Sequence, residues 1–342
     1  MLWTDIATHY HSPTGQLAGP HSRAYGQYLA PDVTAIISRG LPDGKVSDPG
    51  LRELFYAVNA VHAPAPCPEK LHRYFDPIRK PRVREQVFTR GNCPVSGCTL
   101  LDPAYTIGSI NHSIMWDQRR NVIGYWISGN PARPHSLHLR LLRDGYDFSS
   151  GYLVAAQSKG SVLAGIGLVT DGGDRHCCLD LLKDGTIETE DLRARLHLYD
   201  VPASLEPPKC SFGEPIELEY GSAALRVRVE KAAFGDSAPT LEFTRQGADA
   251  YLDVVLYHGP RRKFDLREVE SAHVLMTISM RSKGTAAPKD SPAEFREIGD
   301  RLNAEWSPGG GRPLSIGLNR RPLPQRTVRE IACASHKHDQ PR

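Results

Sequence analysis

The sequence of 342 residues predicts a mainly β protein that begins with a short α-helical segment. Two patterns support this prediction. Apolar residues recur at helical spacing only near the start, whereas from about residue 104 they alternate with polar residues at every second position. Turn-forming dipeptides separate the alternating runs. About a dozen such strands, with no repeat of propeller or solenoid period, predict one large antiparallel β-sandwich.

We expect four parts along the chain. An α-helical segment occupies residues 1–75, and a connector at 76–103 follows it. The connector is predicted from proline-rich stretches such as "DPIRKPRVRE". The antiparallel β-sandwich then spans residues 104–335, and a tail at 336–342 ends the chain.

The helical segment is predicted from two stretches. Pro20 occupies a favoured first helical position, and "HSRAYGQYLA" follows it as a short helix. The clearer helix is "DPGLRELFYAVNAVHAP", in which Asp48 is a good N-cap, Pro49 a good first residue, and Pro64 a stop signal. Its apolar side chains share one face: Leu51, Leu54, Phe55, Val58 and Val61.

The strands are predicted from alternating runs. The clearest are "GSVLAGIGLV", "LRARLHLY", "ALRVRVE", "AYLDVVLYHG", "HVLMTISM" and "RPLSIGLN". Turns are expected at "DGGD", "KDGT", "HGPRR" and "SPGGGRP". One late stretch, "SPAEFREIGDRLNAEW", is expected to be helical.

Composition excludes some classes of partner. The formal net charge of +3 is small and the basic residues are interleaved with acidic ones, so we expect no nucleic acid partner. No stretch approaches the roughly 20 apolar residues of a membrane span, so we expect no membrane partner. The start lacks the pattern of a signal peptide; the compartment is therefore unknown, with cytoplasmic as the default.

The seven cysteines are an odd number and form no paired CxxC motif. Cys93 and Cys98 could close a small disulfide loop in an oxidising compartment. Free thiols in a reducing compartment are the favoured alternative.

The stretch "GPHSRAYG" carries the first candidate site. On a helix, His21 and Tyr25 lie one turn apart on the same face, and Arg23 is close in sequence. Such side chains suit proton abstraction next to a carboxylate, because arginine stabilises the enolate-like charge while tyrosine or histidine moves the proton. The alternative is a helix start with three solvated polar residues.

The stretch "YTIGSINHSIMWDQRR" carries the second candidate site. Asn111, Gln118 and Arg119 could hydrogen-bond sugar hydroxyls or a carboxylate. Trp116 could stack on a sugar, and His112 could act as acid, base or charge neutraliser. The alternative is a sheet edge with an exposed polar face.

A metal site has weaker support. Asp174 and His176 are possible ligands within "TDGGDRHCCLD", but the spacing matches no compact metal motif and "DGGD" is an ordinary hairpin turn. We therefore expect no cofactor, with a divalent metal near Asp174 and His176 as the alternative.

The order of these features resembles the heparinase II/III-like and alginate-lyase-like polysaccharide lyases, in which an (α/α) toroid precedes an antiparallel super-sandwich. The resemblance implies that Tyr25 and His21 are catalytic, together with His112 from the sandwich. By role, Arg23, Asn111 and Arg119 would neutralise charge. About 75 helical residues match only the end of a toroid. The chain is then a truncated product, a reduced relative, or one whose helical domain another chain completes.

The expected function is cleavage of uronic-acid-containing glycans by β-elimination, with an acidic polysaccharide or oligosaccharide as substrate. Trp116 and Gln118 would help to bind it. A glycoside hydrolase is a close variant, although no two carboxylates are paired by spacing. The alternative from another class is a non-catalytic module that binds glycan or protein, or an inactive relative.

Overall fold

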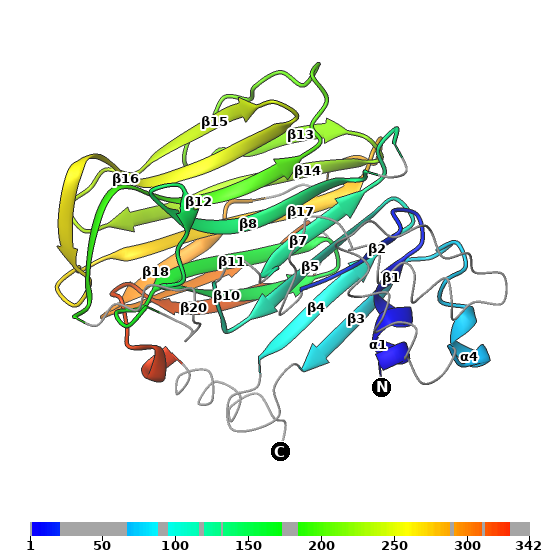
Figure 1. The fold of residues 1–342 in the computed structure, drawn as a ribbon, viewed down its shortest axis with the longest axis horizontal. Helices are drawn as coiled ribbons and strands as arrows, with labels where there is room; N and C mark the ends of the chain where they lie inside the picture. The colour runs from blue at the N-terminus through cyan, green and yellow to red at the C-terminus, as the bar shows by residue number, and fades with distance from the viewer. Residues whose placement is uncertain are drawn as a thin grey trace, which may run out of the picture.

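Antiparallel strands dominate the computed structural model of this chain (Figure 1). The structure describes residues 2–20, 67–87, 95–115, 120–130, 133–172, 184–287, 291–309 and 312–328. In these ranges the strands form sheets of nine, six, three and two strands, all with antiparallel neighbours. The prediction of a mainly β protein is therefore confirmed.

The nine-stranded sheet contains the longest strands. Its spatial order is β15 (Thr240–Gln246), β16 (Asp249–Asp265), β12 (Thr186–Tyr199), β8 (His135–Arg143), β7 (Val122–Trp126), β5 (Tyr105–Asn111), β4 (Ser96–Leu101) and β3 (Arg82–Val87), and β9 (Tyr146–Asp147) pairs with β8.

The strands of the six-stranded sheet are interleaved in the chain with those of the nine-stranded sheet, and the strands of the three-stranded sheet come last. The six-stranded sheet has the order β13 (Ile216–Tyr220), β14 (Ala223–Phe234), β17 (Ala272–Ser282), β11 (Ser161–Leu168), β10 (Gly151–Ser158) and β6 (Ser113–Ile114). The three-stranded sheet has the order β18 (Glu294–Ile298), β19 (Arg301–Trp306) and β20 (Leu314–Asn319).

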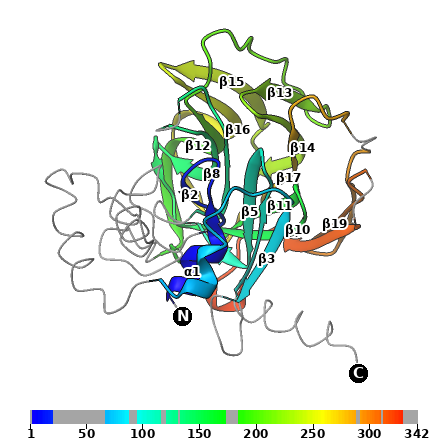
Figure 2. The ribbon, with the colours of Figure 1, turned by 90° about the vertical axis from the view of Figure 1, so that its right-hand side faces the viewer.

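Two apolar cores hold these sheets in three layers. Leu139 of β8 and Met276 of β17 belong to one core, which lies between the nine- and six-stranded sheets. Leu275 of β17 and Leu302 of β19 belong to the second, between the six- and three-stranded sheets. Figure 2 shows β19 beside β10 and β11, on the side away from β8 and β12. The six-stranded sheet is thus the middle layer, and strands such as β11 read as nearly continuous apolar runs because both faces are buried.

The front of the described chain is small. Helix α1 (Leu2–His9) leads into a hairpin of β1 (Tyr10–His11) and β2 (Gln16–Leu17), and a short helix α4 (Glu69–His72) follows later. Of the helices predicted at residues 20–29 and 48–64, only Pro20 lies within the described residues. No helix in the described ranges is long and apolar enough to cross a membrane.

The sheet begins earlier than the boundary predicted at residue 104. The stretch expected to be an irregular connector contains β3 and β4, which pair with each other and with β5. The proline-rich stretch ends at Pro81, and the next prolines, Pro94 and Pro103, lie outside the two strands, so residues 82–87 and 96–101 can join the ladder.

Two further local predictions are wrong. The stretch expected to form a late helix is the hairpin of β18 and β19, in which Ile298 pairs with Arg301 across Gly299 and Asp300. Gly299 has a φ of 59°, which suits a tight two-residue turn. The turn expected at "HGPRR" is part of the continuous strand β16.

Cys98 has a free thiol, and Cys93 lies outside the described residues.

His273 makes the contact between the six-stranded and the three-stranded sheet sensitive to pH. It lies on β17 and is only 2% exposed. Burial lowers its pKa to about 4; the cations Lys231 and Arg320 act in the same direction, whereas Glu297 opposes them. The unfolded chain takes up this proton near pH 6.5 and the folded protein only near pH 4. Stability from His273 is therefore present above about pH 6.5 and is lost as the pH falls through this window.

We predict that His273→Leu flattens the pH dependence of the free energy of unfolding between about pH 6.5 and 4. The difference should be on the order of 3 kcal/mol over the window, because about 2.5 pKa units separate the two states. Urea unfolding at several pH values measures it. His258→Gln is the control, because the side chain of His258 is 73% exposed. An unchanged pH dependence in His273→Leu would contradict this assignment.

Candidate functional site

The outer face of the nine-stranded sheet, opposite the core that it shares with the middle layer, carries the candidate site. Leu137, Leu139 and Leu141 of β8 point into that core. The alternate residues His138 and Arg140 therefore lie on the outer face. His138 is only 1% exposed, so this polar face is covered rather than open to water.

One row of directly paired residues crosses this outer face, and we call it the central row. Its members are Thr99, Gly108, Ile123, His138, His197 and Tyr251, on strands β4, β5, β7, β8, β12 and β16. Directly paired residues project from the same face of a sheet. The central row therefore brings two histidines and a tyrosine from distant parts of the chain onto one line.

The N-terminal segment docks on one end of the central row. A Cβ atom added to Gly108 would lie 2.6 Å from the Cα of Gly19 and 3.0 Å from the Cδ of Pro20. Gly19 itself has a φ of 87° and packs against Thr99. The backbone of this segment thus lies directly on the sheet, where only glycine leaves enough space.

A buried histidine anchors the hairpin just before this contact. The Nε2 of His11 donates to the carbonyl oxygen of Asp102 at 2.7 Å, and its Nδ1 accepts from the hydroxyl of Thr14 at 2.7 Å. Burial lowers the pKa of His11 to about 4, and the nearby Arg82 acts in the same direction. A neutral imidazole therefore fixes the hairpin, and with it the path of the chain toward Pro20.

Arg120 and His138 form the polar centre of the outer face. The Nη1 of Arg120 donates to the Nδ1 of His138 at 3.0 Å. A guanidinium has no acceptor, so Nδ1 of His138 must accept and the ring proton resides on Nε2. Arg120 is 7% exposed, which keeps a cation on a covered surface. Tyr125 lies nearby: burial raises the pKa of its hydroxyl, and the charge of Arg120 partly opposes this.

Two acid–base pairs continue the site along the face. Arg140 binds Asp147 with two parallel hydrogen bonds of 2.9 and 2.5 Å. His197 contacts Asp249 at 2.9 Å and stacks on the ring of Tyr199, with 3.6 Å between ring centres. Burial lowers the pKa of His197 to about 4, although Asp249 favours the protonated form. We regard this ring as neutral near pH 7, because burial is the largest effect.

A cavity of about 10 Å³ lies beside this polar centre. His138, Arg140 and Asp147 line it, together with Met115 and Asn121. Met115 and Asn121 are close in sequence to the stretch 116–119, which carries three of the predicted substrate-binding residues. The cavity is large enough for about one water molecule.

Most of the sequence-predicted site residues lie outside the described part of the chain. These are His21, Arg23, Tyr25, Trp116, Gln118 and Arg119, and also the possible metal ligands Asp174 and His176. Two described residues next to them in the sequence, Pro20 and Arg120, both contact the outer face of the nine-stranded sheet. Gly108 under Pro20 and His138 beside Arg120 are two strands apart, which is about 10 Å.

The two predicted residues that are described lie elsewhere. The side-chain oxygen of Asn111 accepts a hydrogen bond from the backbone N–H of Ala155 at 3.0 Å. Ala155 lies on β10, two residues after Leu153, where the pairing of β10 with β6 ends. His112 has a φ of 56°, at the crossing from β5 to β6. The structure therefore gives Asn111 a contact between sheets and does not bring His112 to the cavity beside His138.

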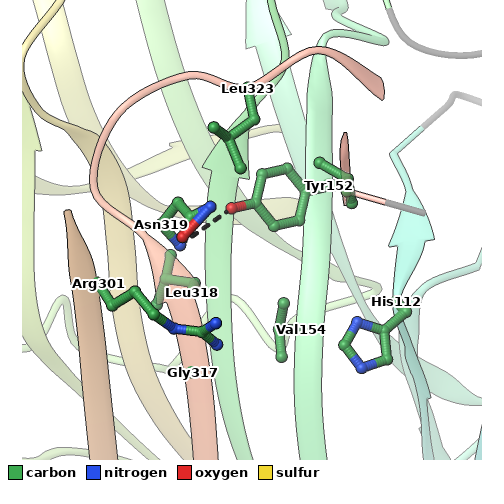
Figure 3. Close-up of a pocket in the computed structure, with 9 residues that line it drawn as sticks. His112, Tyr152, Val154, Arg301, Gly317, Leu318, Asn319 and Leu323 are labelled. Carbon is green, nitrogen blue, oxygen red and sulfur yellow. Dashed lines mark hydrogen bonds between the residues drawn. The ribbon is translucent and has the colours of Figure 1, made fainter. Parts of the chain in front are cut away.

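His112 instead lines a small cavity between the six-stranded and the three-stranded sheet, shown in Figure 3. Its ring lies on one side of Val154, and Arg301 lies on the other. The hydroxyl of Tyr152 accepts from the backbone N–H of Asn319 at 3.2 Å. Burial raises the pKa of Tyr152 to about 12, so this hydroxyl stays protonated.

Sequence reasoning missed the described residues at the centre of the face. Arg120 is next to the predicted Arg119, whereas His138, Arg140 and Asp249 were not proposed. In "LRARLHLY", the alternation of apolar and polar residues indicates that His197 and Tyr199 share the polar face of the strand. Nothing in that pattern shows that the face is covered, and a covered polar face is the feature that marks a candidate site.

Comparison with known proteins gives no family: no protein-family model matches the chain, and no curated protein matches it. Within the described ranges, no three His, Cys, Asp or Glu side chains gather closely enough to hold a metal ion. The functional interpretation therefore depends on the geometry of the outer face.

We predict that Gly108→Ala destabilises the protein by about 1–3 kcal/mol, because the added methyl group displaces the backbone at Gly19 and Pro20. Thermal or urea unfolding measures the change. Gly129→Ala is the matched control, because a Cβ atom there meets nothing within 4 Å. Equal stability of the two variants would contradict the close docking.

Proposed function

We propose that the protein is a polysaccharide lyase-like enzyme that cleaves uronic-acid-containing glycans by β-elimination on the outer face of the nine-stranded sheet. One observation carries the proposal. The central row has Gly19 and Pro20, which directly precede His21 in the sequence, docked on Gly108, and two strands away it has the buried Arg120–His138 pair. Pro20, the residue before the predicted proton-transfer stretch in the sequence, therefore lies two strands, or about 10 Å, from a buried cation.

The proposed reaction uses these groups in complementary roles. Arg120, assisted by Arg23 and Arg119, neutralises the uronate carboxylate and so acidifies the C5–H bond next to it. Tyr25 takes the C5 proton or protonates the leaving oxygen, with His21 assisting. The C5–H and C4–O bonds break, a C4–C5 double bond forms, and the leaving oxygen gains a proton.

His138 has a positioning role in this proposal. Its Nδ1 accepts from Arg120, so its ring holds the guanidinium in one orientation. A planar guanidinium binds a carboxylate best when both face each other edge to edge, so its orientation matters as much as its charge. His112, which lines a different cavity, has no step in this scheme.

The proposal also extends to the fold, beyond the confirmed mainly β class. We infer that the stacked sheets correspond to the super-sandwich of the heparinase II/III-like group. We further propose that the helical segment, with α1 and α4 among its described parts, corresponds to the end of a toroid. The substrate is then an acidic polysaccharide or oligosaccharide, and another chain could complete the helical wall.

We predict that the protein releases unsaturated uronides from at least one polymer in a panel of alginate, glucuronan, pectate and glycosaminoglycans. Ultraviolet absorbance of the C4–C5 double bond measures this. Tyr25→Phe should lower kcat by about 10²–10⁴-fold, because it removes the proton-transfer group. Tyr146→Phe is the control, because Tyr146 is 80% exposed. Saturable binding without turnover on every polymer would instead favour the non-catalytic glycan-binding module.

We predict separately that Arg120→Gln lowers kcat/KM by about 10²-fold or more, because it removes the cation that stabilises the developing charge. Steady-state kinetics on the best polymer measures the loss, and circular dichroism checks the fold. Arg267→Gln is the control, because Arg267 has a 59% exposed side chain paired with Asp265. An active Arg120→Gln with normal kcat/KM would overturn the role of this residue.

A further inference from the structure

A third cavity, of about 50 Å³, lies between the middle layer and the three-stranded sheet. It opens on the face of β11, β14 and β17 that looks away from the nine-stranded sheet. Its polar lining consists of Ser161, Ser279, Arg226 and Arg281, and its other walls include Trp306 and Pro308. Its volume is about four times what one water molecule needs, so a group of a few heavy atoms fits there.

The pairing register brings the polar lining residues together. Ser161 of β11 pairs with Ser279 of β17, and Ser279 pairs in turn with Arg226 of β14. The two serine hydroxyls are 3.2 Å apart. One hydrogen bond between them uses one hydroxyl proton, which leaves the other proton available to donate to a ligand.

One carboxylate holds both arginines at the cavity. Arg226 donates through its Nε to Glu217, and the Nη2 of Arg281 lies 3.5 Å from the other oxygen of the same carboxylate. The side chain of Arg281 is only 22% exposed. A guanidinium has five N–H donors in a fixed fork, so the pairing with Glu217 leaves Arg281 with further donors.

The apolar wall is rigid. Trp306 is 2% exposed and belongs to the second core, and its Nε1 donates to the carbonyl oxygen of Ser291 at 3.1 Å. A fixed indole next to hydroxyl and guanidinium donors gives a cavity that is polar on one side and apolar on the other. Small-molecule sites commonly have this arrangement.

We propose that this cavity binds a small oxyanion, namely the carboxylate or phosphate group of a small molecule. Arginine forks and hydroxyl donors match the oxygens of both groups. The site is distinct from the candidate lyase site, because the cavity and the central row lie on opposite sides of the two stacked sheets and their shared core. Two sheets stack about 10 Å apart, and side chains on both outer faces add to that separation.

The test measures binding of inorganic phosphate and of acetate by isothermal titration calorimetry, at constant ionic strength set with sodium chloride. Saturable binding of either probe to the wild-type protein is expected, and the preferred probe identifies the group. Arg281→Gln should weaken binding at least tenfold, and Ser279→Ala should weaken it several-fold. Arg296→Gln, on the exposed strand β18, is the control and should bind like the wild type.

Three results would overturn the proposal: no saturable binding of either probe, equal binding in Arg281→Gln and the wild type, or equal loss in Arg296→Gln. Circular dichroism and thermal unfolding of each variant separate lost binding from lost folding, and Ser279→Ala still tests the site if Arg281→Gln is unfolded. The titration contains no polymer, so its result does not depend on lyase activity.

Discussion

The pairing register of the nine-stranded sheet is the constraint on which both the core and the candidate site depend. Leu139 pairs with Leu196 in the core, and the adjacent His138 pairs with His197 on the outer face. Side chains alternate strictly along a strand, so a slip of one residue would exchange these two sets. The burial of the leucines therefore also fixes which histidines and arginines meet on the outer face.

The outer face shows how a sheet can keep polar groups away from water. A cation such as Arg120 is costly to bury unless hydrogen bonds satisfy it, and His138 supplies one of them. Arg140 balances the charge of Asp147 on the same surface, and the neutral His197 is hydrogen-bonded to Asp249. An arrangement of this kind adds little net stability but holds donors in fixed directions, as anion recognition requires.

The six-stranded sheet also carries polar residues on the face that it turns toward the three-stranded sheet. The three-stranded sheet covers part of the six-stranded sheet, so polar residues of β17 such as His273 and Thr277 are buried between two sheets. His273, Ser279 and Arg281 lie on one face of β17, and the residues between them, such as Val274 and Met280, point from the opposite face into the first core. The same period of two that builds that core thus builds a polar interface between layers, where a buried histidine and an oxyanion cavity can occur.

The sequence by itself determined the mainly β class and most of the strands, because strict alternation and turn residues are local signals. It misread the stretch at 291–306 as helical, since the Gly299–Asp300 turn that breaks it is only two residues long. It also placed the sheet boundary too late, because the prolines before Pro81 masked the start of β3.

Only the tertiary structure decided which polar residues meet. His138 and His197 are 59 residues apart in the sequence, and their pairing follows from the long-range register of β8 and β12. Sequence reasoning joined Asn111 and His112 to the site because they are close in the chain. The crossing at His112 instead sends one toward Ala155 and the other toward Tyr152. Pattern along a strand tells which residues share a face, but burial of that face depends on segments that pack on it from elsewhere.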